Sequence, residues 1–181
     1  RLNIPVYYRN GTRAHLEQRP NTDCAYWSRS GEELAELIDQ YEVISFDIFD
    51  TLLMRRVLEP QDVFRLVEYT LRIDFGLELP FTKLRLQALH EAGQTAELDD
   101  IYLAFRRISG LGAAQVERIR LKELEIERRV LIPRRPVAAL FRRAAAAGKE
   151  IFVLSDMYLP GGFIREVLAE CGITGDYTLW I

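Results

Sequence analysis

The chain contains few of the residue types that build disulfide scaffolds or metal centres. Among its 181 residues there are two cysteines, Cys24 and Cys171, and two histidines, His15 and His90. Two cysteines so far apart are typical of unpaired thiols in a reducing compartment and not of a disulfide framework. Each histidine lacks neighbouring ligand residues, so neither predicts a metal site. We therefore expect a cytoplasmic protein without a structural disulfide.

Long apolar runs and an excess of charge of one sign are also missing. No stretch approaches the ~20 apolar residues that a membrane helix needs, and the start RLNIPVYYRN lacks the apolar region of a signal peptide. The 24 basic and 27 acidic side chains leave a net charge of −3, so no overall field attracts nucleic acid. The composition predicts a globular chain with no membrane span and no nucleic-acid partner.

The chain alternates between helical and strand-like segments. Ser30 and Glu33 match a capping box, which predicts a helix to about Tyr41. The run Val43–Ile48 is mostly apolar with β-branched members, a pattern typical of a strand covered on both faces. Later segments of the same kinds are a strand over Ile151–Leu154, a helix ending near Cys171 and a strand over Tyr177–Ile181. This alternation predicts an α/β fold with a parallel sheet.

The first two strands are separated by a long segment with helical patterning. Pro60 and Gly76 bracket one helix, and Pro80 and Gly93 bracket the next. Further helices are predicted over Leu98–Ile108, Ala113–Leu131 and Val137–Ala147. A segment of roughly ninety residues is too long for a simple crossover between parallel strands.

These boundaries predict three parts of the chain. Residues 54–147 form an inserted helical cap domain. Residues 30–53 and 148–181 form the α/β core, and residues 1–29 are a lead-in segment of unknown role.

Polar residues follow two of the predicted strands. Asp47 ends the first apolar run and is followed by Asp50 and Thr51, while Ser155 and Asp156 follow the second strand. Ligands of open parallel sheets bind beyond the carboxyl ends of the strands, so we expect these two ends to be neighbours. A carboxylate at such a place can attack an electrophile, and a hydroxyl group with backbone amides can hold the oxygens of the transferred group. The pattern favours phosphoryl transfer.

Both segments resemble motifs of the haloacid dehalogenase (HAD) superfamily. Phe46-Asp47-Ile48-Phe49-Asp50-Thr51-Leu52 is similar to its motif I, and Leu154-Ser155-Asp156-Met157-Tyr158 is similar to its motif II. The stretches ISFDIFDTLLMRR and VLSDMYLP resemble a subgroup of predicted hydrolases that are attached to, or encoded beside, glycosyltransferases of surface-polysaccharide synthesis. The middle segment is similar to that subgroup's cap at Phe81, Leu84, Arg85, Leu98, Asp99, Ile101, Tyr102, Glu123, Glu125 and Glu127. The resemblance covers about 42–181 and implies a Rossmann-like parallel sheet with an inserted helical cap of the C1 type.

The resemblance also implies catalytic roles for particular residues. Asp47 is expected to be the nucleophile, and Ser155 is expected to bind an oxygen of the transferred phosphoryl group. Thr51 is expected to tie the motif I loop in place. Mg²⁺ is the cofactor that the family uses, and Asp47 with the main-chain carbonyl of Phe49 would hold it.

Candidate substrate-binding residues are Thr51, Asp156 and Arg56. For Asp156, as for Asp50, the simpler alternative is a hydrogen bond to loop amides. For the arginines just past motif I, Arg55 and Arg56, the hypothesis that one steers an anionic substrate competes with a surface ion pair.

Phe49 is the first departure from the family pattern. HAD phosphatases usually carry a second aspartate two positions after the nucleophile, where it serves as general acid. Dehalogenases of the family lack that acid and commonly carry an aromatic residue there. General acid catalysis contributes about 10²–10⁴ in rate, so a phosphatase without it would favour leaving groups that need no proton. We do not expect Asp50, one position further on, to replace it.

The second departure is the absence of the family's later lysine or arginine and of its later acidic pair. Arg165 is the one basic residue after Ser155, and it lies on the predicted helix that follows motif II. Gly175 and Asp176 only superficially resemble the acidic motif, and we interpret them as a turn. We therefore expect an incomplete catalytic core, which is either the first piece of a longer protein or a degenerate domain.

These residues support three functional hypotheses. The first is an aspartate-nucleophile hydrolase of a small phosphorylated metabolite, for example a sugar phosphate, provided that the chain continues past residue 181. The second is a noncatalytic HAD-like module that supports a glycosyltransferase. A dehalogenase-type hydrolase of carbon–halogen bonds is a variant of the first.

Overall fold

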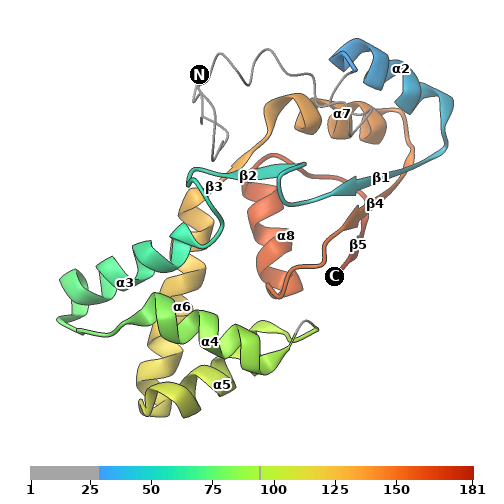
Figure 1. The fold of residues 1–181 in the computed structure, drawn as a ribbon. Helices are drawn as coiled ribbons and strands as arrows, with labels where there is room; N and C mark the ends of the chain where they lie inside the picture. The colour runs from blue at the N-terminus through green and yellow to red at the C-terminus, as the bar shows by residue number, and fades with distance from the viewer. Residues whose placement is uncertain (1–28, 94) are drawn as a thin grey trace. The chain divides into compact units, whose positions relative to one another are not determined.

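A computed structural model describes residues 29–181 with the exception of residue 94, and Figure 1 shows its helices and strands. The lead-in segment over 1–29 falls outside the described residues except for its last position, as do His15 and Cys24. Cys171 is half-buried, and burial raises the pKa of its thiol. Within 29–93 and 95–181, no helix has both the length and the apolar composition needed to span a membrane.

The residues form two compact units, here called the sheet unit and the helical unit. The sheet unit contains the described residues up to Met54, together with Ile132–Ser155 and Leu168–Ile181. The helical unit contains Arg55–Leu131 and Asp156–Val167. Residues 132–147, which the predicted cap includes, therefore have their contacts in the sheet unit. The division into a catalytic core and a cap stays a prediction.

The sheet unit is built on three parallel strands. They are β1 (Val43–Asp47), β4 (Glu150–Leu154) and β5 (Thr178–Trp180), in the order β1-β4-β5. Asp47 lies opposite Leu154, and Leu154 lies opposite Trp180. The predicted α/β class with a parallel sheet is confirmed.

Two helices of the sheet unit lie side by side (Figure 1). α2 (Gly31–Gln40) begins at Ser30, where both hydrogen bonds of the predicted capping box are present. α7 (Arg135–Ala146) packs on the sheet, because the ring of Phe141 lies 5.5 Å from that of Phe46. One face of β1 is thus covered by α7.

β1 is buried on one face only, so the expectation that both faces are covered is wrong. Phe46 is 6% exposed and Ile48 is fully buried, whereas Val43 is 53% exposed. Ser45 and Asp47 point to the same side as Val43 and are exposed too. The run resembled a doubly buried strand because Val43 is apolar although it faces outward. The same alternation leaves Asp47 accessible.

Two short strands, β2 (Leu53–Arg55) and β3 (Leu131–Pro133), form a second sheet. The helical prediction is wrong at both places, since it began at Met54 and ran through Leu131. Strands of three residues are too short to show a period of two, and their pairing is not visible locally. The chain leaves the sheet unit within β2 and returns to it within β3.

The helical unit contains four of the predicted helices, of which the first two are bracketed by proline and glycine in the sequence. They are α3 (Asp62–Phe75), α4 (Phe81–Ala92), α5 (Leu98–Ser109) and α6 (Ala113–Val130). The ring of Phe81 lies 6.3 Å from that of Phe64 and 5.4 Å from that of Phe105, with all three side chains buried. α8 (Gly161–Glu170) begins in this unit and ends in the sheet unit. These helices confirm the predicted ones to within a few residues.

A charged pair lies inside this apolar core. Arg85 is 0% exposed and Glu123 is 2% exposed, and the guanidinium donates to both carboxylate oxygens at 2.9 Å. The hydroxyl of Tyr102 donates to the same carboxylate at 2.6 Å. Burial alone would lower the pKa of Arg85, but the Glu123 carboxylate raises it above its usual range. The Arg85 guanidinium and the Glu123 carboxylate thus form a buried ion pair, and each group depends on the other for compensation.

We expect the substitution Glu123→Gln to destabilise the protein strongly. It preserves the size of the side chain but leaves the Arg85 guanidinium without its counter-charge, and breaking a buried ion pair costs about 3–5 kcal/mol. Equilibrium unfolding in urea measures the change. The matched control is Glu125→Gln on the same helix, whose partly exposed ion pairs with Lys122 and Arg129 contribute about 1 kcal/mol or less. Equal losses in the two variants would contradict this role of the buried pair.

Candidate functional site

The loop after β1 is wound around two buried side chains, Ile48 and Leu52, which are both 0% exposed. The amide of Leu53 donates to the carbonyl of Ile48 at 2.8 Å, and the amide of Leu52 donates to the carbonyl of Asp47 at 3.3 Å. These bonds close the loop immediately after Asp47. The carboxyl group therefore projects from a backbone that is fixed on both sides.

Thr51 contacts Asp47 directly. Its Oγ1 donates a hydrogen bond of 2.7 Å to Oδ2 of Asp47. The bond fixes one carboxylate oxygen and thereby orients the other. Thr51 thus links the loop to the carboxyl group that the family resemblance assigns as nucleophile.

Asp50 is the one described non-glycine residue with a positive φ, at 57°. Its carbonyl accepts a hydrogen bond of 2.6 Å from Nη1 of Arg134. Arg134 follows β3, and its own amide donates to the carbonyl of Leu52 at 2.8 Å. A residue far away in the sequence therefore contacts the loop at two points.

The end of β4 lies beside the end of β1, as expected for adjacent parallel strands. The amide of Ile48 donates to the carbonyl of Leu154 at 3.1 Å, and the amide of Ser155 donates to the carbonyl of Trp180 at 2.9 Å. Asp47 pairs with Leu154 in the register. Asp47 and Ser155 consequently leave neighbouring strands at the same edge of the sheet.

Two candidate substrate-binding residues belong to the helical unit. Asp156 follows Ser155 directly and is exposed, but its contacts are those of the helical unit. Arg56 is exposed as well and belongs to the same unit. Their role in substrate binding stays a prediction.

Arg55 and Tyr158, which border the two motif segments, are anchored inside the helical unit. Arg55 is 8% exposed, and its Nε donates to Glu127 at 2.7 Å. Burial raises the pKa of Glu127, and Arg55 offsets part of this rise. The ring of Tyr158 lies 4.9 Å from the Arg85 guanidinium, and burial raises the pKa of Tyr158 to about 12. The Arg55 guanidinium is thus engaged in a buried ion pair, which is a structural role.

Phe49 occupies the position two residues after Asp47. It is half-buried and forms an isolated bridge with Leu53. A phenyl side chain cannot donate a proton to a leaving group, so this loop position supplies no general acid.

The described residues offer an incomplete set of ligands for Mg²⁺. The family resemblance suggests the Asp47 carboxylate and the main-chain carbonyl of Phe49. Over 29–93 and 95–181, no group of three or more His, Cys, Asp and Glu residues could hold a metal ion. Mg²⁺ requires a near-octahedral shell of oxygen ligands, and these two groups alone do not fit that requirement.

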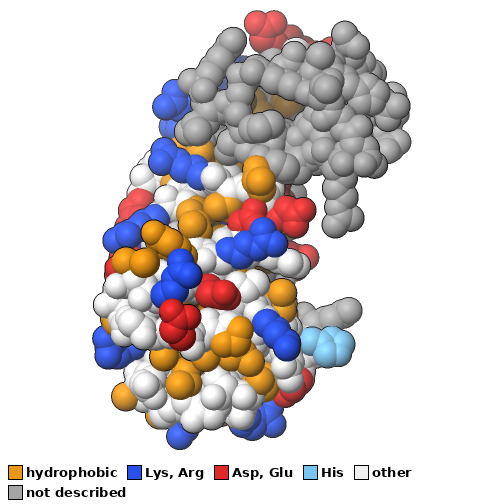
Figure 2. All heavy atoms as spheres, turned by 60° about the vertical axis from the view of Figure 1, so that its left-hand side comes forward, with side chains coloured by type: hydrophobic (Ala, Val, Ile, Leu, Met, Phe, Trp, Pro, Cys, Tyr) orange, Lys and Arg blue, Asp and Glu red, His pale blue; other side chains and the backbone are white. Residues whose placement is uncertain are grey.

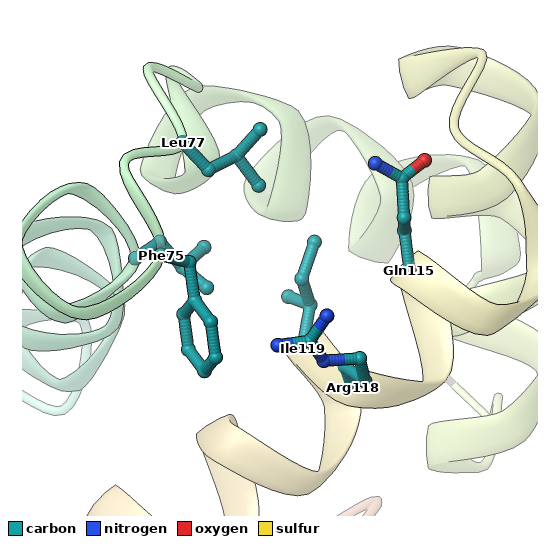
Figure 3. Close-up of a pocket in the computed structure, with 6 residues that line it drawn as sticks. Phe75, Leu77, Gln115, Arg118 and Ile119 are labelled. Carbon is teal, nitrogen blue, oxygen red and sulfur yellow. The ribbon is translucent and has the colours of Figure 1, made fainter.

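Among the described residues, the helical unit lines two cavities that include none of the strand-end residues. One has a volume of about 110 Å³ and lies between α3 and α6 (Figure 3). Its lining residues are Leu71, Phe75, Leu77, Gln115, Arg118 and Ile119. The Arg118 guanidinium lies 4.8 Å from the centre of the Phe75 ring at its rim. The second cavity, of about 420 Å³, is lined by Arg65, Glu68, Tyr69, Arg72, Leu77, Glu78, Leu79 and Pro80.

The surface around α3 carries charges of both signs. Figure 2 shows Lys and Arg side chains interspersed with Asp, Glu and apolar side chains over this face. Tyr69 and Ile73 of α3 are 57% and 60% exposed. The face therefore resembles a mixed protein surface and not a continuous basic patch.

No protein-family model matches the chain, and no curated protein sequence matches it significantly. The assignment to the HAD superfamily accordingly remains an expectation that rests on the two motif segments.

Sequence reasoning missed Arg134, which contacts the loop after β1. The hydrogen bond joins residues 84 positions apart, so no local pattern could reveal it. The segment Pro133–Pro136 marked only a break between helices. A contact of this kind depends on where the chain re-enters the sheet unit after the helices. The periodicity of apolar residues predicts only local secondary structure and does not reveal this position.

We expect the residue at position 50 to control the stability of the loop. A φ of 57° lies in the left-handed region, which glycine adopts freely and which a β-branched residue strongly disfavours. Asp50→Val should lower the free energy of unfolding by about 1–2 kcal/mol, while Asp50→Gly should change it by less than about 1 kcal/mol.

Urea unfolding of both variants checks this expectation. Asp176→Val is a suitable control, since Asp176 is exposed in the bend before β5 and does not have a positive φ. Equal free energies of unfolding for Asp50→Val and Asp50→Gly would show that the backbone conformation is not the cause.

Proposed function

We propose that this chain provides the nucleophile loop and the phosphate-binding strand end of a HAD-type hydrolase. Its substrate is a small phosphorylated metabolite, for example a sugar phosphate. The observation that supports this proposal most directly is that Asp47, which is exposed, and Ser155 lie at the ends of adjacent parallel strands. The strand order β1-β4-β5 is compatible with a HAD-like sheet, and the four helices between β2 and β3 are compatible with an inserted cap.

The reaction that fits this arrangement is a two-step displacement at phosphorus. Thr51 donates to Oδ2 of Asp47, so we assign the attack to Oδ1. A bond forms between Oδ1 and phosphorus while the bond from phosphorus to the oxygen of the leaving group breaks. A water molecule then attacks the phosphorus of the aspartyl phosphate, which releases inorganic phosphate and restores the carboxylate of Asp47.

Ser155 would contribute to the same reaction by binding the phosphoryl group that is transferred. Its hydroxyl, together with backbone amides at the strand ends, would bind phosphoryl oxygens on which negative charge is concentrated. Because Ser155 and Asp47 leave neighbouring strands, one phosphoryl group can contact both. Neither residue protonates the leaving group, so it departs with the bonding electron pair as an oxyanion and takes its proton from solvent water.

The nucleophile assignment is tested by Asp47→Asn. An amide is a poor nucleophile, so hydrolysis of 4-nitrophenyl phosphate by the native gene product should fall by at least about 10³-fold. Rapid acid quenching and mass spectrometry should detect a phosphoryl group on the peptide that contains Asp47 in the wild type alone. Asp99→Asn, at an exposed position of the helical unit, is the control. An Asp47→Asn protein that still turns over would disprove the assignment.

Phe49 leads to a separate prediction about the leaving group. Without a general acid, the rate should fall steeply as the leaving group becomes more basic, because acid catalysis is worth about 10²–10⁴. Comparison of kcat/KM for 4-nitrophenyl phosphate and phenyl phosphate measures this dependence. We expect Phe49→Asp to raise the rate for phenyl phosphate more than for 4-nitrophenyl phosphate. Equal rates for both substrates in the wild type would contradict the prediction.

A noncatalytic module that supports a glycosyltransferase is the second candidate. Phe49 in place of an acid favours it, as does the incomplete ligand set for Mg²⁺ among the described residues. Such a module needs the fold of the chain but not the Asp47 carboxylate. Restoration of glycan synthesis by the Asp47→Asn protein in a strain that lacks the gene would support this candidate over the hydrolase.

A further inference from the structure

We propose that Arg134 is a positioning residue for Asp47, a proposal that rests on the proposed function of Asp47 as nucleophile. Arg134 occupies the N-cap position of α7, directly after β3. The chain has just returned to the sheet unit at this point. The contacts of Arg134 reach the loop between β1 and β2.

Arg134 holds the backbone of that loop at two carbonyl groups. Nη1 donates to the carbonyl of Asp50 at 2.6 Å, and the amide donates to the carbonyl of Leu52 at 2.8 Å. Arg134 is half-buried, while its hydrogen bond to Asp50 lies at an exposed part of the loop. The donor of this bond is charged, and hydrogen bonds from charged donors are stronger than those between neutral groups.

The side chain of Arg134 donates its hydrogen bond to Asp50, which is the residue of the loop with a strained backbone. Asp50 has a φ of 57°, where an L-residue brings Cβ close to a carbonyl oxygen of the backbone. Such a conformation persists only where surrounding contacts determine it. The guanidinium of Arg134 supplies one of these contacts at the carbonyl of the strained residue itself.

The conformation of Asp50 bears directly on the nucleophile. Thr51 follows Asp50 in the chain, and its hydroxyl donates to Oδ2 of Asp47 at 2.7 Å. A change of φ at Asp50 would rotate the peptide that carries Thr51 and break that hydrogen bond. Arg134 therefore acts on Asp47 through Asp50 and Thr51, without contacting the carboxylate.

Three variants separate this role from a general contribution to folding. Arg134→Met keeps a long side chain and the main-chain amide that donates to Leu52 but removes the guanidinium donors. Arg134→Lys keeps a charge that can reach one carbonyl but lacks the planar fork. In the double variant Arg134→Met, Asp50→Gly, glycine adopts the positive φ without help. The matched control is Arg135→Met at the next, exposed position.

The readout is the binding of beryllofluoride, a phosphoryl mimic, to the native gene product with Mg²⁺ present, followed by ¹⁹F NMR. We expect Arg134→Met to weaken binding at least tenfold and Arg134→Lys to have an intermediate effect. Asp50→Gly added to Arg134→Met should restore the affinity to within about threefold of the wild type. Arg135→Met should bind as the wild type does, and Asp47→Asn should not bind.

Three results would overturn the proposal. The first is unchanged affinity in Arg134→Met. The second is a loss of affinity that Asp50→Gly does not repair, and the third is a loss that only parallels a fall in melting temperature. Either of the last two would indicate a general structural role.

Failure of the proposed function can be recognised independently. If the wild type and Asp47→Asn both fail to bind beryllofluoride, the result counts against the proposed function and not against the positioning role, and hydrogen exchange then decides the role of Arg134. The amide of Leu53, bonded to Ile48 at 2.8 Å, should exchange at least tenfold faster in Arg134→Met and recover with Asp50→Gly. Unchanged exchange would refute the positioning role.

Discussion

The parallel pairing of β1 with β4 is the constraint on which the candidate site depends. It places Asp47 opposite Leu154, although α3 to α7 separate these two residues in the chain. A slip of one residue would turn Asp47 to the other face of the sheet and expose Phe46, whose ring packs against Phe141. Burial on one face therefore fixes the register, and the register places Asp47 and Ser155 at the same edge of the sheet.

The packing of the helical unit depends on a different kind of interaction from that of the sheet unit, because its core contains a buried ion pair. Arg85 lies against the rings of Phe64, Tyr102 and Tyr158 and is compensated by Glu123. Such a pair adds little net stability compared with apolar residues of the same size, but alternative packings would leave a charge unpaired. Tyr158 belongs to the segment that leaves β4 after Ser155. The packing that selects the arrangement of these helices consequently also fixes that segment.

The sequence predicts those parts of the fold that depend on neighbouring residues. The capping box at Ser30 and the glycine at Gly76, which ends its helix in a left-handed conformation, act within one turn and were visible. The pairing of β2 with β3 and the contact of Arg134 with Asp50 depend on distant segments meeting, and no periodic pattern encodes them. Asp47 and Ser155 were found as candidates because each ends an apolar run. The single buried face of β1 was missed, since Val43 is apolar but exposed.

Phe49 has a consequence for the lifetime of a covalent intermediate. A residue that donates a proton to the leaving group in the first step can accept one from water in the second, by microscopic reversibility. A phenyl group can do neither. If Asp47 is phosphorylated as proposed, its acyl phosphate would therefore persist longer than in an enzyme with a carboxylate at this position. A persistent acyl phosphate could pass its phosphoryl group to an acceptor better than water, so the same loop would suit transfer between metabolites as well as hydrolysis.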